Sequence, residues 1–241
     1  MPTRKERQAL RVRNAIIAFV ALVAILVIGF GTWYSTGISD GEYREGTHYE
    51  LVDEPQRRRA GAPMRVREFF SYGCIHCRNF DPLIEDWKST LPEDVVFERT
   101  PVAFSPTWTL LARAYYTLEA VGALDENHDR LFRAIHDNRR QFLSAEMLAD
   151  FVDGYGTTRA AFLRAFESAP VQRQVREAEE AQRAMGITSV PTLVIDGAYR
   201  VGMNVGRKTA LDVASHLIAR SRNGADDAAT LSERGSAAGG R

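Results

Sequence analysis

The sequence predicts a mixed α/β protein in which an all-helical domain is inserted between strands, preceded by one N-terminal transmembrane helix. Three observations support this fold class. A long uncharged segment lies near the N-terminus, strand-like apolar runs lie on both sides of residues 105–185, and apolar residues inside that range recur at helical spacing. Without the apolar segment and the C-terminal tail, the remaining length suits one domain with its own core.

Residues 1–14 form a basic segment, whose charged residues are Arg4, Lys5, Glu6, Arg7, Arg11 and Arg13. Residues 15–34 carry no charge and are mostly apolar; as a helix they reach roughly 30 Å, the thickness of a bilayer core. The positive-inside rule leaves the N-terminus in the cytoplasm and sends the rest across. The alternative is a cleaved signal peptide, but its apolar core is usually only about 7–15 residues long. Both interpretations export the domain.

Residues 35–60 are interpreted as a linker and a first strand, at 48–52, in which His48 is a surface residue. Residues 61–104 form the first part of the α/β domain. A strand over 64–72 leads into Cys74, and apolar residues after Cys77 recur at helical spacing. Pro82 predicts a kink in that helix, and 95–99 is the next strand.

Residues 105–185 are interpreted as the inserted helical domain. Ser105 can cap a helix whose first position is Pro106. Further helices are predicted at about 125–139, 144–153, 158–167 and 170–185. His128 and His136 share a helix face, but no Cys, Asp or Glu cluster in the sequence completes a metal site with them.

Residues 186–221 form the second part of the α/β domain. Strands at 192–195 and 198–201 are joined by Asp196-Gly197, a strong hairpin signal, and a last helix covers about 207–220. Residues 222–241 are rich in Ala, Gly, Ser and Asp, which predicts a disordered tail. The order is therefore β-β-α-β, helical block, β-β-α.

The only two cysteines lie in Cys74-Ile75-His76-Cys77, between a predicted strand and a predicted helix. A helix start has unpaired N–H groups and a partial positive charge, so a thiolate there is stabilised. We therefore expect Cys74 to be the exposed, low-pKa nucleophile and Cys77 the shielded resolving thiol, with a protonated His76 adding positive charge beside Cys74. A purely structural disulfide is disfavoured because the CxxC loop is too small to stabilise much.

This order of elements resembles the DsbA family of exported thiol–disulfide oxidoreductases, in which a thioredoxin fold carries an inserted helical domain. The likeness runs from about residue 42 to 220. It is strongest at Gly61-Ala62-Pro63, at Glu68-Phe69-Phe70-Ser71, at the CxxC segment and again over 186–197.

The resemblance implies further site residues. Val190-Pro191 matches the family's cis-proline loop, whose backbone pairs with a bound peptide as an added strand. Glu68 occupies the buried acidic position and Arg99 a basic position often paired with it, which implies proton shuttling to or from Cys77. Ile75 departs from the family, whose best-known members have proline there, and this leaves the reduction potential open.

The sequence thus predicts a membrane-anchored dithiol oxidase facing the periplasm from the bacterial inner membrane. It would donate the Cys74–Cys77 disulfide to reduced exported polypeptides through a mixed disulfide, be re-oxidised by a DsbB-type membrane partner, and need no cofactor or metal. The balance of 31 basic and 31 acidic residues argues against a nucleic-acid partner. Two alternatives stay open: a reductase or isomerase kept reduced, and an exported metal carrier binding a soft ion such as Cu(I) through the cysteines and His76.

Overall fold

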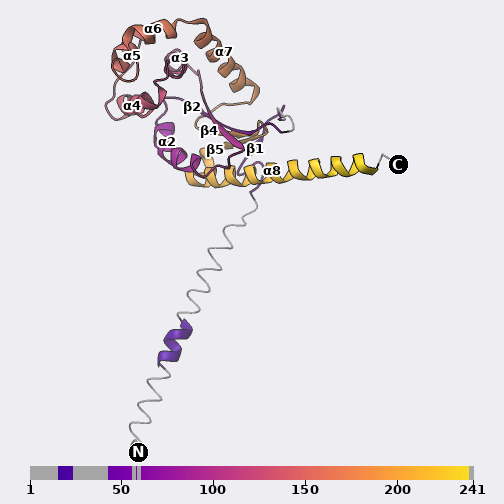
Figure 1. The fold of residues 1–241 in the computed structure, drawn as a ribbon. Helices are drawn as coiled ribbons and strands as arrows, with labels where there is room; N and C mark the ends of the chain where they lie inside the picture. Colours follow the sequence, from indigo (N-terminus) through magenta and orange to yellow (C-terminus); the bar gives the residue numbers. More distant parts are fainter. Residues whose placement is uncertain (1–15, 24–42, 56–57, 59–60, 239–241) are drawn as a thin grey trace, which may run out of the picture. The chain divides into compact units, whose positions relative to one another are not determined.

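A five-stranded sheet in the order β1-β5-β4-β2-β3 forms the centre of the domain (Figure 1). The computed structural model describes residues 16–23, 43–55, 58 and 61–238. The strands are β1 (Glu50–Leu51), β2 (Met64–Phe70), β3 (Val95–Pro101), β4 (Thr192–Ile195) and β5 (Tyr199–Gly202). β2 pairs parallel with β3 and antiparallel with β4, so segments from both sides of the helical insertion meet at the middle of the sheet.

Burial explains which strand predictions hold in full. β4 matches the predicted 192–195 at both ends and is buried throughout. β2 starts at the predicted residue 64 and ends at 70, two residues before the predicted end, with Met64, Val66 and Phe69 completely buried. The strand expected at 48–52 contains only the two residues of β1. This strand lies at the sheet edge and pairs with β5 alone, and Leu51 is 45% exposed, so little packing extends it.

The predicted hairpin is present between β4 and β5. Asp196 and Gly197 both have positive φ, of 50° and 63°. Two successive positive φ angles are the signature of a type I′ turn, whose twist matches that of the flanking strands.

Two helices of the thioredoxin-like part pack against one another. These are α2 (Ile75–Lys88), which continues through Pro82, and α8 (Arg207–Ala238). The Trp87 indole Nε1 of α2 donates a hydrogen bond to Ser215 Oγ of α8 at 2.8 Å. The helix end predicted near 220 differs from the structure, in which α8 continues to Ala238. That extension contains no proline, which would stop a helix, although Gly224 and Gly235 within it are poor helix formers. The disordered tail at 222–241 stays a prediction.

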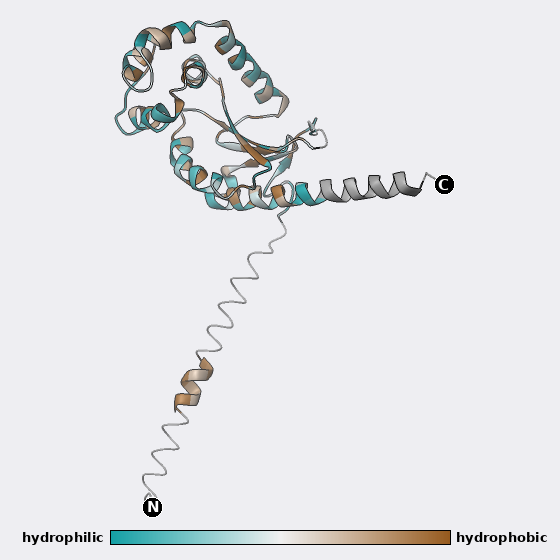
Figure 2. Cartoon of the chain, viewed as in Figure 1, coloured by the Kyte–Doolittle hydropathy of each residue, from teal (hydrophilic) through white to brown (hydrophobic). Residues whose placement is uncertain are grey.

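The helical insertion comprises α3 (Pro106–Ala120), α4 (Leu124–His136), α5 (Ala145–Val152), α6 (Arg159–Phe166) and α7 (Ala169–Ala184). Four of these helices begin with a hydroxyl that accepts a hydrogen bond from the backbone N–H three residues on; the caps are Ser105, Ser144, Thr158 and Ser168. The apolar core of the block includes Phe70, Tyr72, Cys74 and Cys77. The CxxC segment therefore lies where the insertion meets the sheet. Figure 2 shows the central strands coloured as apolar and the outer helix faces as polar.

At the N-terminus, residues 16–23 form a helix with exposed apolar side chains. Among the residues that the structure describes, no helix combines the length and the apolar character needed to cross a bilayer. The rest of the predicted 15–34 anchor and all of the basic segment 1–14 lie outside the described residues.

Candidate active site

Cys74 is the N-cap residue of α2, as the CxxC spacing predicts. Its backbone is extended (φ −100°, ψ 116°), and its Sγ accepts a hydrogen bond from the Cys77 backbone N–H at 3.4 Å. No acidic residue lies in the first turn of α2, so nothing there opposes the positive end of the helix dipole. The sulfur thus takes the place that a Ser or Asp oxygen takes at most helix starts.

The two thiols have opposite acid–base behaviour. The hydrogen bond from the Cys77 thiol is the main cause that lowers the pKa of Cys74 to about 6. Burial opposes this shift, whereas the backbone N–H groups of Cys77 and His76 and the His76 charge add to it. Cys77 is completely buried, and burial together with the Cys74 thiolate raises its pKa far above the ordinary value. At neutral pH the free pair is therefore one thiolate and one thiol.

The Val190–Pro191 peptide bond is cis, which confirms the expectation for this loop. The Val190 carbonyl oxygen lies 3.5 Å from Cys74 Sγ, so the loop covers the nucleophile directly. Ile75 is 47% exposed and His76 is also exposed. Cys74 itself is only 8% exposed, so the expectation of an exposed nucleophile is wrong; the Val190 carbonyl oxygen lies against its sulfur. An incoming thiol first meets Ile75 and His76.

Glu68 and Arg99 are Cα partners in the parallel pairing of β2 with β3. Arg99 Nε donates to Glu68 Oε2 at 2.9 Å, and Arg99 Nη2 also lies 2.8 Å from Asp81 Oδ1 and 2.7 Å from Glu85 Oε1. Burial raises the pKa of Glu68 to about 7, with the Arg99 charge opposing it. The Glu68 charge is the smallest of the named causes that raise the pKa of Cys77, and proton transfer between the two groups stays a prediction.

A second group of side chains near the thiols comes from α4. His128 Nε2 lies 3.0 Å from Asp81 Oδ1 and its Nδ1 lies 2.8 Å from the Tyr72 hydroxyl, while His136 Nε2 donates to the Tyr72 carbonyl oxygen at 2.8 Å. Sequence reasoning missed this group. The shared face of the two histidines was visible, but their partners lie 47 to 64 residues away and no motif links them.

An aromatic pair from the start of the insertion packs beside the motif. Phe104 and Trp108 contact each other as tilted rings with centroids 5.6 Å apart, and Phe104 is 40% exposed. A methyl group on Gly73 would lie only 2.7 Å from the Trp108 indole nitrogen. The residue before Cys74 must therefore be glycine for the indole to fit.

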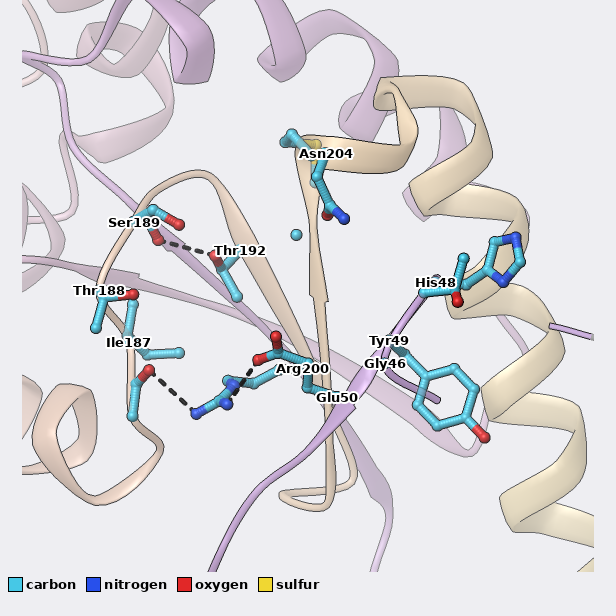
Figure 3. A pocket seen from close by; sticks show the side chains of 14 residues that line it. Gly46, His48, Tyr49, Glu50, Ile187, Thr188, Ser189, Thr192, Arg200 and Asn204 are labelled. Carbon is cyan, nitrogen blue, oxygen red and sulfur yellow. Dashed lines mark hydrogen bonds and ion pairs between the residues drawn. The ribbon is translucent and has the colours of Figure 1, made fainter. Parts of the chain in front are cut away.

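A cavity of about 400 Å³ lies beside the cis-proline loop, lined by Thr188, Ser189 and Thr192 on one side (Figure 3). Arg200 donates to the carbonyl oxygens of Met185 and Gly186, directly before Ile187, and pairs with Glu50 at 2.7 Å. The strongest charges of the cavity are thus already paired, and they fix the segment that leads into the loop. Within the described part of the chain, no group of three or more His, Cys, Asp or Glu residues could hold a metal ion.

A family model for the DSBA-like thioredoxin domain matches residues 65–217, more than half of the chain. The chain belongs to the DsbA family. It is 34% identical over 214 residues to the thiol:disulfide interchange protein DsbA of Azotobacter vinelandii, covering 87% of this chain and 96% of that protein. It is 31% identical over 203 residues to the DsbA of Pseudomonas aeruginosa strain PAO1, covering 83% of this chain and 96% of that protein.

The crystal structure of Pseudomonas aeruginosa DsbA matches the fold with a TM-score of 0.73 at 32% identity, covering 78% of this chain and 98% of that one. The fold is thus the thioredoxin-like DsbA fold with its helical insertion. Like its DsbA relatives, the chain is a thiol:disulfide oxidoreductase, and the CxxC geometry supplies the two sulfurs that such exchange needs.

Proposed function

We propose that this DsbA-family protein works as a dithiol oxidase, donating the Cys74–Cys77 disulfide to reduced exported polypeptides. The observation that carries the proposal is the position of Cys74 at the N-cap of α2, where its Sγ accepts the Cys77 backbone N–H at 3.4 Å. At this position hydrogen bonds from Cys77 lower the pKa of Cys74, while burial raises that of Cys77. A stabilised thiolate favours the reduced pair over the disulfide, which makes the disulfide a stronger oxidant.

The reaction then runs in two exchanges. A substrate thiolate attacks Cys74 Sγ, the Cys74–Cys77 bond breaks, and Cys77 leaves with the electron pair and takes a proton from Glu68. A second substrate thiolate attacks the substrate sulfur of the mixed disulfide, and Cys74 leaves as a thiolate. The substrate has lost two electrons and the CxxC pair has gained them. Val190 and Pro191 orient the substrate backbone, and His76 stabilises the departing Cys74.

The equilibrium reduction potential of the full chain, measured in detergent against a glutathione series, tests the direction of electron flow. A value well above about −200 mV supports a disulfide donor, whereas one near about −270 mV, the thioredoxin range, supports the reductase alternative. Deleting a DsbB-type re-oxidase in the producing bacterium should trap Cys74 and Cys77 reduced if that partner restores the disulfide. The metal-carrier alternative has no supporting ligand set in the described part of the chain.

We also propose that residues 15–34 anchor the chain in the bacterial inner membrane with the catalytic domain in the periplasm. The support is the charge pattern, basic before the apolar segment and mainly acidic directly after it. Protease added to spheroplasts should degrade the catalytic domain and leave the N-terminal segment protected in the membrane fraction. A mature chain that starts after residue 34 would instead identify a cleaved signal peptide.

A further inference from the structure

The buried acidic cluster beneath the thiols contains more negative than positive charge. Arg99 contacts Glu68, Asp81 and Glu85, and the first two carboxyl groups are almost completely buried. The charged and titratable groups that act on the cluster are Arg99 of β3, Cys77, Arg78 and Lys88 of α2, Tyr72 before α2, Tyr115 of α3 and His128 of α4. Lys88 pairs with the surface carboxylate Glu85, and Arg78 acts on Asp81 only through its charge, so Arg99 is the one direct ion-pair partner of the two buried carboxylates Glu68 and Asp81. One direct cation for two buried carboxylates favours a retained proton near neutral pH.

Glu85 does not hold the proton, because its side chain is 46% exposed and the adjacent Lys88 and Arg99 lower its pKa against the effect of partial burial. The two possible sites are therefore Glu68 and Asp81. The other two carboxyls differ in their hydrogen-bond donors. Asp81 Oδ1 lies within 3.0 Å of both Arg99 Nη2 and His128 Nε2, whereas Glu68 Oε2 faces Arg99 Nε. A carboxylate with two donors is stabilised more than one with a single donor.

The contacts of His128 define which of its nitrogens carries the hydrogen. Burial lowers the pKa of His128 and raises that of Tyr72, so the imidazole is neutral and the phenol keeps its proton. The Tyr72 hydroxyl then donates to Nδ1, which leaves the hydrogen on Nε2 pointing at Asp81. The reversed arrangement would require a proton on Asp81 Oδ1, the oxygen that already accepts from Arg99.

We propose that His128 is a positioning residue for the exchange reaction: by donating its Nε2–H to Asp81, it keeps the proton of the cluster on Glu68. The inference rests on the proposed function, in which Glu68 supplies a proton to the leaving Cys77. Two effects agree with this placement. Burial raises the pKa of Glu68. For Asp81, burial also raises the pKa, but the hydrogen bond from His128 is the largest of the effects that lower it. The helical insertion thus controls where the proton of the thioredoxin part resides.

Infrared spectroscopy of the reduced full chain at pH 6 locates the proton. We expect one buried carboxylic-acid band that Glu68→Gln removes and that ¹³C labelling of aspartate carboxyls leaves in place. In His128→Leu the band should move on aspartate labelling. In the matched control His128→Gln, whose amide keeps a donor, it should not. The proposal is overturned if the carboxylic-acid band of the wild type already moves on aspartate labelling. It is also overturned if the band of His128→Leu does not move on that labelling.

A second measurement needs no variant. The ¹⁵N shifts of His128 at pH 7 should report a neutral ring with the hydrogen on Nε2; an Nδ1–H tautomer or an imidazolium overturns the proposal, even if His128→Leu fails to fold. In His128→Leu, and not in His128→Gln, the Glu68 midpoint in the pH profile of substrate oxidation should fall by about one pH unit. The spectroscopic results concern the reduced protein alone, so they stand whatever the reduction potential shows about the direction of electron flow.

Discussion

At the scale of single residues, the acidity of Cys74 depends first on the thiol of Cys77. Replacing Cys77 with alanine removes that donor, so the pKa of Cys74 should rise from about 6 by roughly one unit. Alkylation by iodoacetamide follows the thiolate, and its rate against pH gives the midpoint. The matched control is Cys77→Ser, whose hydroxyl keeps a donor and should leave the midpoint close to the wild-type value. If both variants keep the wild-type midpoint, the low pKa of Cys74 comes from the helix start alone and not from the Cys77 thiol.

Gly73 provides a second residue-scale prediction. Gly73→Ala places a methyl group against the Trp108 indole and should destabilise the fold by about 1–3 kcal/mol, as overpacking does. Trp108→Phe has a smaller ring, and we expect the double variant to recover part of the loss. Urea unfolding of the four proteins in a double-mutant cycle measures this coupling. Additive effects would mean that the close approach of the indole is not what requires glycine.

At the scale of elements, the cap of α3 supports the redox site. Ser105 Oγ accepts from the Trp108 backbone N–H, so it holds the turn that presses the indole on Gly73. Ser105→Ala should cost about 1 kcal/mol in unfolding free energy and also change the Cys74 alkylation rate. Ser168→Ala removes the corresponding cap of α7 and should cost a similar amount. If Ser168→Ala changes the Cys74 alkylation rate as much as Ser105→Ala does, the effect comes from general destabilisation of the fold and not from the α3 cap.

The helices were predictable because their signals are local. The helix starts predicted at 106, 125, 144, 158 and 170 each lie within one residue of those of α3 to α7, and Ser105 with Pro106 is the local signal for the first. Where a boundary depends on tertiary contact, the prediction is less accurate. β1 loses most of its expected length at a sparsely packed sheet edge.

The active site divides in the same way. The CxxC motif and Val190-Pro191 are contiguous signals, and the resemblance to the DsbA family also located Glu68 and Arg99. The contact of Asp81 with His128 joins residues 47 apart, from two different parts of the fold. Neither residue has a neighbour in the sequence that indicates the other. Such a contact exists only once α4 packs on α2, so one sequence gives no sign of it.

At the scale of the whole molecule, Glu68 links global stability to pH. Its pKa is about 7 in the folded protein against 4.5 as the ordinary value. Because the pKa is higher in the folded protein, the contribution of Glu68 to the free energy of unfolding is complete below about pH 4.5. It is lost as the pH rises through 7, by about 3 kcal/mol in total. Glu68→Gln cannot ionise, so it should become more stable than the wild type as pH rises.

Urea unfolding of the reduced proteins at pH 4.5, 6 and 8 measures this linkage. The surface variant Glu167→Gln, whose side chain is 68% exposed in the wild type, provides the control and should follow the wild-type pH profile. A Glu68→Gln profile parallel to that of the wild type would show that Glu68 binds its proton equally in the folded and unfolded chains.

The helical insertion between β3 and β4 also has a consequence for biosynthesis. Chains grow from the N-terminus, and domains generally fold as units during synthesis. Cys74 and Val190 are 116 residues apart, so the nucleophile is made long before the strand and loop that cover it. During this interval the nascent chain presents two accessible sulfurs on an unfinished sheet. A newly made copy is therefore itself exposed to unwanted cross-linking with other thiols until the C-terminal strands join the sheet.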